Sequence, residues 1–243
     1  MRRERLLQNY LKSTFCEEKS EPNASILANM TQIDVSLTDY GLAVECMCFA
    51  FLITQFRSAA TSLSKAFGVA FLSIAVAGVA GGTVHGFFLD VRTIGYRILW
   101  PFTLIVMGIT GLSGVHIGTA LQFSNRTRVN INRIALAAFV LYVLVVLFVR
   151  RDFLIAIVGY FPALMFMGGG FLFAYRRRRR PPFLVGFLGI CLMLFAAAAQ
   201  QAKLGIHPRY FDHNALYHLL QAIALFMVFL AAREAIMSRE PIN

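Results

Sequence analysis

The stretch FLIAIVGYFPALMFMGGGFLFAY, residues 153–175, decides the fold class, because it carries no charged side chain along its whole length. A helix needs roughly 20 mostly apolar residues to cross a bilayer. The apolar residues are continuous here, whereas a strand of a membrane β-barrel would alternate. The predicted spans are residues 37–56, 66–89, 98–122, 131–149, 153–175, 183–202 and 213–232. The sequence therefore predicts an all-α, polytopic membrane protein with seven transmembrane helices.

The segments outside these spans are short, so no separate soluble domain is expected. Residues 1–36 mix basic and acidic side chains with few apolar ones and lack the apolar core of a secretory signal. We expect them to form a tail that is partly disordered or a surface helix. Residues 37–234 then make the transmembrane domain, and residues 235–243 make a short C-terminal tail.

Most of the lysines and arginines behind the net charge of +11 lie in the connections between spans, which excludes nucleic acid as the partner and indicates membrane lipids. The run from Arg176 to Arg180 lies on the more basic side. Because basic loops stay in the cytoplasm, the N-terminus is predicted outside and the C-terminus inside. Arginine greatly outnumbers lysine, which favours a GC-rich genome and a bacterial cell membrane.

Ionisable side chains in the spans indicate where function resides, because they are costly at membrane depth. The segment Phe211–His218 opens the last span with Asp212, His213 and His218, and His85 ends the second span. At about 1.5 Å per helical residue, His85, His218 and Glu45 of the first span fall in one leaflet, whichever way the chain is oriented. The sequence therefore predicts a polar pocket in that leaflet.

Imidazoles with a carboxylate suit a zinc ion, which in catalytic sites keeps one position for water and polarises a carbonyl group. The candidate ligands are His85, His213 and His218. Glu45, Asp90 or Asp212 would accept a proton or orient a ligand. His213 and His218 lie about 140° apart around a helix, so His213 reaches a shared metal only if it precedes the helix. The competing interpretation is that each histidine only hydrogen-bonds between helices.

Seven spans, an acid in the first, a histidine late in the second and a histidine motif opening the seventh resemble the CREST superfamily. It includes the alkaline ceramidases, the progestin and adipoQ receptors and the hemolysin III proteins. The resemblance implies zinc held by His85 and His218, with Glu45 as the acid, and hydrolysis of a lipid amide. Asn214 stands where the family motif has its first histidine, and Gly81 stands where the family has a serine.

Two function classes remain open on these residues. The first is a zinc-dependent hydrolase that acts within the membrane on a lipid amide or ester. The second is a non-enzymatic seven-span receptor, or a small-solute transporter, with a polar pocket in the outer leaflet. Zinc bound in a stoichiometric amount would separate the first class from the second.

Overall fold

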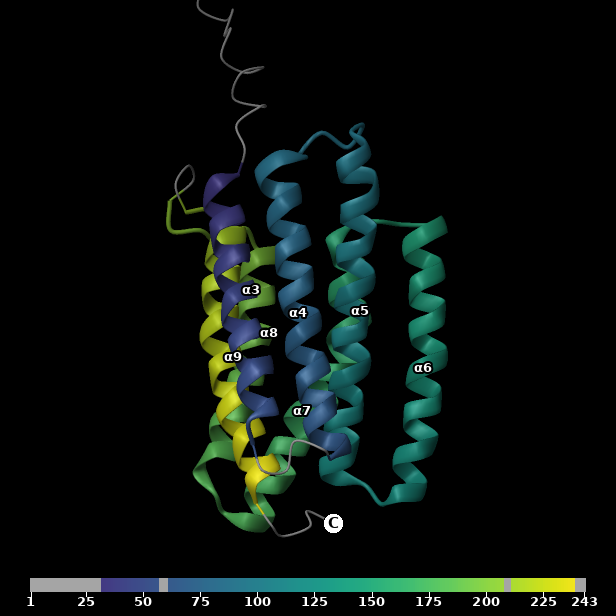
Figure 1. The fold of residues 1–243 in the computed structure, drawn as a ribbon, viewed down its shortest axis with the longest axis vertical. Helices are drawn as coiled ribbons and strands as arrows, with labels where there is room; N and C mark the ends of the chain where they lie inside the picture. Colours follow the sequence, from purple (N-terminus) through teal and green to yellow (C-terminus); the bar gives the residue numbers. More distant parts are fainter. Residues whose placement is uncertain (1–31, 57–60, 208–210, 239–243) are drawn as a thin grey trace, which may run out of the picture. The chain divides into compact units, whose positions relative to one another are not determined.

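The computed structural model describes residues 32–56, 61–207 and 211–238. Its helices are α3 (Ile33–Thr54), α4 (Ser62–Phe87), α5 (Ile94–Gln122), α6 (Asn125–Phe148), α7 (Phe153–Arg178), α8 (Pro181–Gln201) and α9 (His213–Met237) (Figure 1). All seven are long and apolar enough to cross a membrane. The predicted all-α, seven-span fold is therefore confirmed, and the chain is an integral membrane protein. Of the predicted N-terminal tail, residues 1–31 lie outside the described part.

Polar residues at the helix starts fix where several spans begin. The side chains of Thr61, Thr93 and Asp212 accept hydrogen bonds from backbone N–H groups in the first turns of α4, α5 and α9. Pro181 opens α8, where its missing N–H leaves no helical hydrogen bond unmade. The caps explain why α4 and α5 begin before the apolar runs predicted from residues 66 and 98.

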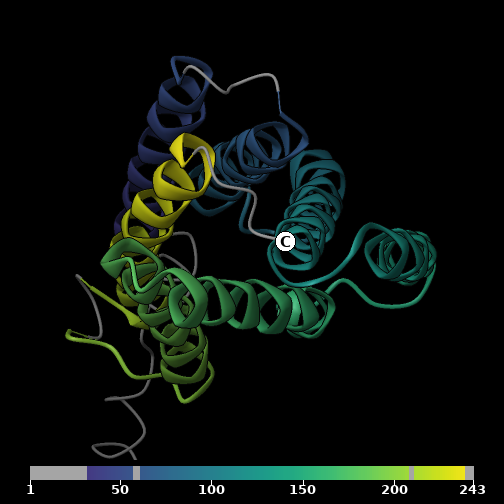
Figure 2. The ribbon, with the colours of Figure 1, turned by 90° about the horizontal axis from the view of Figure 1, so that it is seen from below.

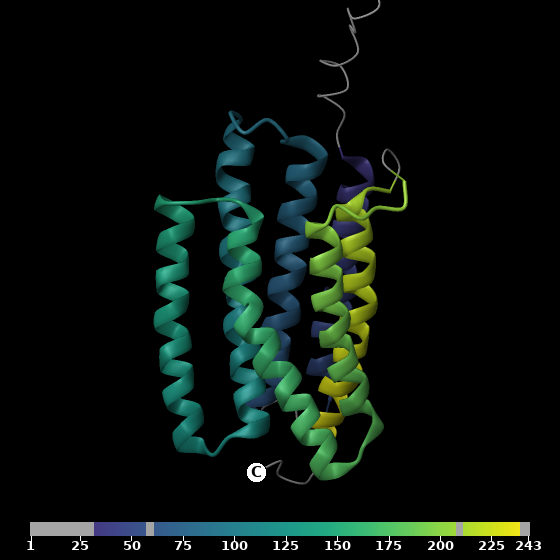
Figure 3. The ribbon, with the colours of Figure 1, turned by 180° about the vertical axis from the view of Figure 1, so that it is seen from behind.

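Six helices form a ring in which each packs against the next in the order α3, α4, α5, α7, α8 and α9, and α9 returns to α3 (Figure 2). Helix α6 lies outside this ring against α5, and Val146 is its one buried residue. Successive helices alternate in direction (Figure 3). As a result, the starts of α3 and α9 and the end of α4 meet at the same end of the bundle.

A stripe of glycines on α4, Gly78, Gly82 and Gly86, brings this helix close to α3. A Cβ atom added at Gly78 would lie 2.9 Å from the backbone oxygen of Asp39, and one at Gly82 would lie 3.0 Å from its Cβ. The hydroxyl of Ser36 donates to the backbone oxygen of Gly82 over 2.8 Å. Small residues of this kind allow membrane helices to approach closely. Here they fix the position of Asp39 in the bundle.

Aromatic side chains fill the bundle between Asp39 and the end where α9 finishes. Phe49 of α3 stacks on Phe229 of α9 with ring centroids 4.5 Å apart, and Phe71 of α4 meets Phe49 edge-on at 5.3 Å. Offset and edge-on contacts are the favoured geometries of aromatic pairs. This packing holds α3, α4 and α9 in register where the polar residues of the three helices meet.

Candidate functional site

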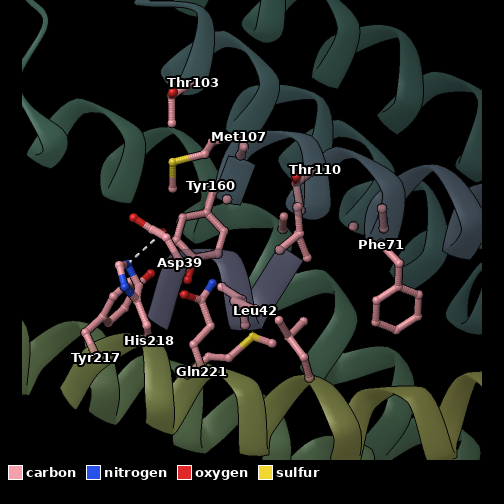
Figure 4. Close-up of a pocket in the computed structure, with 18 of the residues that line it drawn as sticks. Asp39, Leu42, Phe71, Thr103, Met107, Thr110, Tyr160, Tyr217, His218 and Gln221 are labelled. Atoms are coloured by element: carbon pink, nitrogen blue, oxygen red, sulfur yellow. Dashed lines mark ion pairs between the residues drawn. The ribbon is translucent and has the colours of Figure 1, made fainter. Parts of the chain in front are cut away.

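A cavity of about 180 Å³ lies inside the ring of helices. Most of its wall is apolar, and Phe67, Phe71, Leu225 and Val228 line it toward the end where α9 finishes. Its polar lining comes mainly from residues near the other end: Asp39, His85, Gln200, Asn214, His218 and Gln221. Figure 4 shows several of these side chains pointing toward one another. The cavity therefore offers an apolar compartment with a polar head, inside a membrane domain.

Asp39 of α3 and His218 of α9 form an ion-pair contact in this polar region (Figure 4). The distance from Nε2 of His218 to Oδ1 of Asp39 is 3.3 Å, and only 12% of the histidine side chain and 8% of the aspartate side chain are exposed. Ionisable pairs within membrane domains commonly mark proton-transfer or substrate sites. The contact joins the first and last helices of the ring.

The second ring nitrogen of His218 shows which atoms hold protons. Oγ1 of Thr38 lies 3.1 Å from Nδ1 of His218, and it lies 3.0 Å and 2.9 Å from the backbone oxygens of Asp34 and Val35. A hydroxyl has one hydrogen, and within a helix it is commonly donated to a backbone oxygen of the preceding turn. Thr38 then accepts the proton of Nδ1. With Nδ1 protonated, Nε2 is the ring nitrogen that faces Oδ1 of Asp39.

The second carboxyl oxygen of Asp39 has no hydrogen-bond partner in the described part of the chain. This oxygen, Oδ2, is buried. A Cβ atom added at Gly81 would lie 3.4 Å from it, so the glycine leaves space at this position. A buried carboxyl oxygen without a partner is costly unless a ligand or water satisfies it. Oδ2 is therefore an unmet acceptor at the wall of the cavity.

His85 of α4 completes the polar region. Its Nδ1 lies 2.7 Å from Oε1 of Gln32, and its ring meets Trp100 edge-on at 6.2 Å. Because an amide oxygen can only accept, Nδ1 donates and Nε2 is left as the accepting nitrogen of the neutral ring. His85 lines the same cavity as His218. The structure thus brings these two histidines to one cavity.

His213 and Asp212 lie at the start of α9 and do not line the cavity. Oδ1 of Asp212 accepts from the backbone N–H groups of Asn214 and Ala215 over 2.8 and 2.9 Å. Nδ1 of His213 lies 3.8 Å from Oδ2 of Asp212. Asp212 is thus the cap of α9, and His213 is its first helical residue, turned away from the face that carries His218.

Glu45 and Asp90 also lie apart from the cavity. Glu45 is half-buried on α3, and its Oε2 has no partner in the described part of the chain. Asp90 is exposed between α4 and α5, where its Oδ1 accepts from the backbone N–H of Arg92 over 2.9 Å. The structure brings neither carboxylate to His85 or His218.

The histidine side chains predicted as zinc ligands and the carboxylates predicted beside them are not arranged around one point. Among the described residues, no three histidine, cysteine, aspartate or glutamate side chains are grouped so that they could hold a metal ion. Both ring nitrogens of His218 contact protein atoms, and a metal at Nε2 would have to displace Asp39. The residues as placed do not fit a bound zinc ion, so zinc stays a prediction.

Asp39, Tyr160 and Tyr217 are among the lining residues that sequence reasoning did not select. Asp39 lies near the start of the first predicted span, at a depth where carboxylates are ordinary. Its one distinguishing signal is that it lies opposite the glycine stripe of the second span, where a helix contact is expected. Tyrosines are common in membrane helices, so nothing in the sequence separates these two from the others.

Comparison with known protein families finds a match over most of the helical domain. A model described as a family of unknown function, DUF6962, covers residues 35–237, which is nearly the whole helical domain. No curated protein and no solved structure matches the chain. The resemblance to the CREST superfamily therefore stays a prediction.

Proposed function

We propose that this chain, which belongs to the family of unknown function DUF6962, takes a lipid amide or ester into its cavity and hydrolyses it at Asp39 and His218. The observation that carries the proposal is the 3.3 Å contact between these two side chains in the polar region of an otherwise apolar cavity. The contact supports acid–base chemistry, and the cavity supports an amphiphilic substrate.

The distribution of polarity in the cavity supports a lipid as the substrate. Ligand sites are mostly apolar, with a few polar groups that fix the orientation of the bound molecule. An acyl chain fits against Phe67, Phe71 and Leu225, and an amide or ester group then lies at the level of Asp39 and His218. The free amine or alcohol portion points toward Gln200 and Asn214 at the bundle end.

Hydrolysis needs one group that accepts a proton from water and one that gives a proton to the leaving group. In the form with a charged imidazole ring and a carboxylate, Oδ2 of Asp39 accepts the proton as water adds to the carbonyl carbon. His218 then donates the proton at Nε2 to the leaving nitrogen or oxygen as its bond to carbon breaks. The products are a carboxylic acid and an amine or alcohol, and proton return from Asp39 to His218 restores the pair.

Only the resemblance to the CREST superfamily suggests zinc. A bound zinc ion would supply an activated water molecule. Metal analysis of the purified protein tests it. Stoichiometric zinc that is lost in His85→Ala and His218→Ala would support zinc, whereas hydrolysis by zinc-free protein would assign the chemistry to the side chains alone.

The proposal is tested with purified protein in lipid nanodiscs, supplied with N-acyl amines and acyl esters of different chain lengths. Released fatty acid is measured by mass spectrometry. We expect release by the wild-type protein and by Glu45→Gln, whose side chain lies outside the cavity, but not by Asp39→Asn. Lipids that bind the wild-type protein and are recovered intact would contradict hydrolysis and favour the receptor or transporter.

A further inference from the structure

Two tyrosine hydroxyl groups lie in the cavity without a partner. Tyr160 of α7 and Tyr217 of α9 both line the cavity, and the hydroxyl oxygens are buried with no hydrogen-bond partner in the described residues. The two hydroxyls lie near each other, but they make no hydrogen bond of acceptable length and angle, and Asp39 lies near Tyr217. Figure 4 shows them beside Asp39, His218 and Gln221. The polar region thus holds three buried atoms whose hydrogen bonds are not made: these two hydroxyls and Oδ2 of Asp39.

Other tyrosines between the helices differ from this pair. Tyr142 donates to the backbone oxygen of Leu104 over 2.7 Å, and the hydroxyl of Tyr40 lies 3.1 Å from that of Thr83. Buried hydroxyls normally have partners, and leaving one without a partner costs free energy. The exceptions at Tyr160 and Tyr217 therefore indicate a partner that is supplied by a bound molecule.

The two rings are held in place by their surroundings. Phe153 packs edge-on against the ring of Tyr217, with centroids 6.0 Å apart and planes at 81°. Gly111 of α5 leaves space beside Tyr160, since a Cβ atom there would lie 3.4 Å from the Cβ of the tyrosine. Donors that are already positioned do not need to reorganise when charge develops on a substrate.

We propose that the hydroxyls of Tyr160 and Tyr217 both donate hydrogen bonds to one carbonyl oxygen of the bound lipid. This inference rests on the proposed function, and it names the recognised group as the carbonyl of an amide or ester. Two donors at one oxygen stabilise the negative charge that develops there when water adds. Oδ2 of Asp39, the third unpartnered atom, remains available to the attacking water. An ether or hydrocarbon lipid offers these tyrosines no comparable acceptor.

The test uses a long-chain alkyl methyl ketone with a ¹³C-labelled carbonyl, which cannot be hydrolysed. Hydrogen bonds to a carbonyl oxygen lower its infrared stretching frequency. We expect a lower frequency in the wild-type protein than in protein-free nanodiscs, and a return toward the protein-free value in Tyr160→Phe and Tyr217→Phe. Tyr142→Phe is the matched control, because its hydroxyl donates to Leu104, and it should leave the frequency unchanged.

Binding of an alkyl ether of the same length, which lacks the carbonyl, separates recognition from structural damage. Weaker ketone binding with unchanged ether binding in the two variants supports the inference. Equal weakening of both ligands would overturn it, and so would the protein-free frequency for ketone bound to the wild type. A lowered frequency in a protein that hydrolyses no lipid would support the carbonyl-binding site and would contradict the proposed hydrolase activity.

If hydrolysis is observed, the kinetics give a second readout. Removing one donor to a developing oxyanion lowers kcat by roughly 10²–10³-fold. We expect Tyr160→Phe and Tyr217→Phe to lower kcat in this way with little change in KM, whereas Tyr142→Phe should keep the wild-type kcat. Wild-type kcat in both cavity variants would contradict the proposed role of the tyrosines.

Discussion

His218 contacts Asp39 through Nε2 at 3.3 Å and Thr38 through Nδ1 at 3.1 Å, so two consecutive residues of α3 hold opposite sides of one imidazole ring. Helices α3 and α9 are neighbours, and both start at the same end of the bundle. The contact therefore fixes the ring orientation of His218 and leaves Oδ2 of Asp39 free for a ligand.

Asp39→Asn keeps the size of the side chain and removes its ability to take up a proton. We expect hydrolysis to fall by about 10²–10⁴-fold, the usual contribution of a general acid or base. The measurement is the turnover rate in nanodiscs, with the melting temperature as the check on folding. Turnover near the wild-type value in a folded Asp39→Asn protein would show that this carboxyl group is not the proton acceptor.

Thr38→Val replaces the hydroxyl that accepts from Nδ1 of His218 with a methyl group of similar size. Because the imidazole then loses its hydrogen bond at Nδ1, we expect turnover to fall by roughly tenfold, the effect of about 1.4 kcal/mol. Thr38→Ser restores the hydroxyl and should restore most of the activity. Equal losses in both variants would mean that Thr38 acts through its packing.

Gly78→Ala should destabilise the bundle, because the new Cβ would lie 2.9 Å from the backbone oxygen of Asp39 and would push α4 from α3. Overpacking of this kind typically costs about 1–3 kcal/mol. Gly68→Ala on the same helix is the control, since a Cβ there meets nothing within 4 Å. The two free energies of unfolding are compared by denaturation in detergent. A control as unstable as Gly78→Ala would contradict the packing argument.

Asn132→Ala should loosen α6, whose one buried residue is Val146. The amide of Asn132 donates to Nδ1 of His116 over 3.0 Å and accepts from Oγ1 of Thr119 over 3.1 Å. Hydrogen bonds between membrane helices contribute about 0.6 kcal/mol on average, so a loss of roughly 1 kcal/mol is expected.

The control for that experiment is Asn130→Ala, because Asn130 is exposed on the same helix. The free energy of unfolding should stay at the wild-type value in this variant. If Asn132→Ala is no less stable than Asn130→Ala, the hydrogen bonds of Asn132 do not hold α6 against α5.

The depth of each polar residue could be predicted from the sequence, but its direction around the helix could not. His85 and His218 line one cavity, as expected from their equal depth. Glu45 and Asp39 share α3, yet six residues correspond to about 240° around a helix, so only one of them faces the cavity. The contact of α3 with Gly78 and Gly82 selects Asp39, and that contact depends on packing between distant segments.

The depth of Asp90 and Asp212 did not show whether local backbone groups compete for each carboxylate. Asp212 is occupied as the cap of α9, and Asp90 accepts from Arg92 in a connection. Short polar side chains at helix starts favour such bonds. Tyr160 and Tyr217 could be recognised only once the structure showed that their hydroxyls lack partners.

Hydrolysis in water labelled with ¹⁸O, followed by mass spectrometry of the released fatty acid, tests most directly whether the protein hydrolyses a lipid through Asp39. The account predicts that the wild-type protein releases ¹⁸O-labelled acid from a lipid amide or ester, and that Asp39→Asn releases almost none. Intact lipid recovered from wild-type protein that demonstrably binds it, or equal release by Asp39→Asn, would contradict the account.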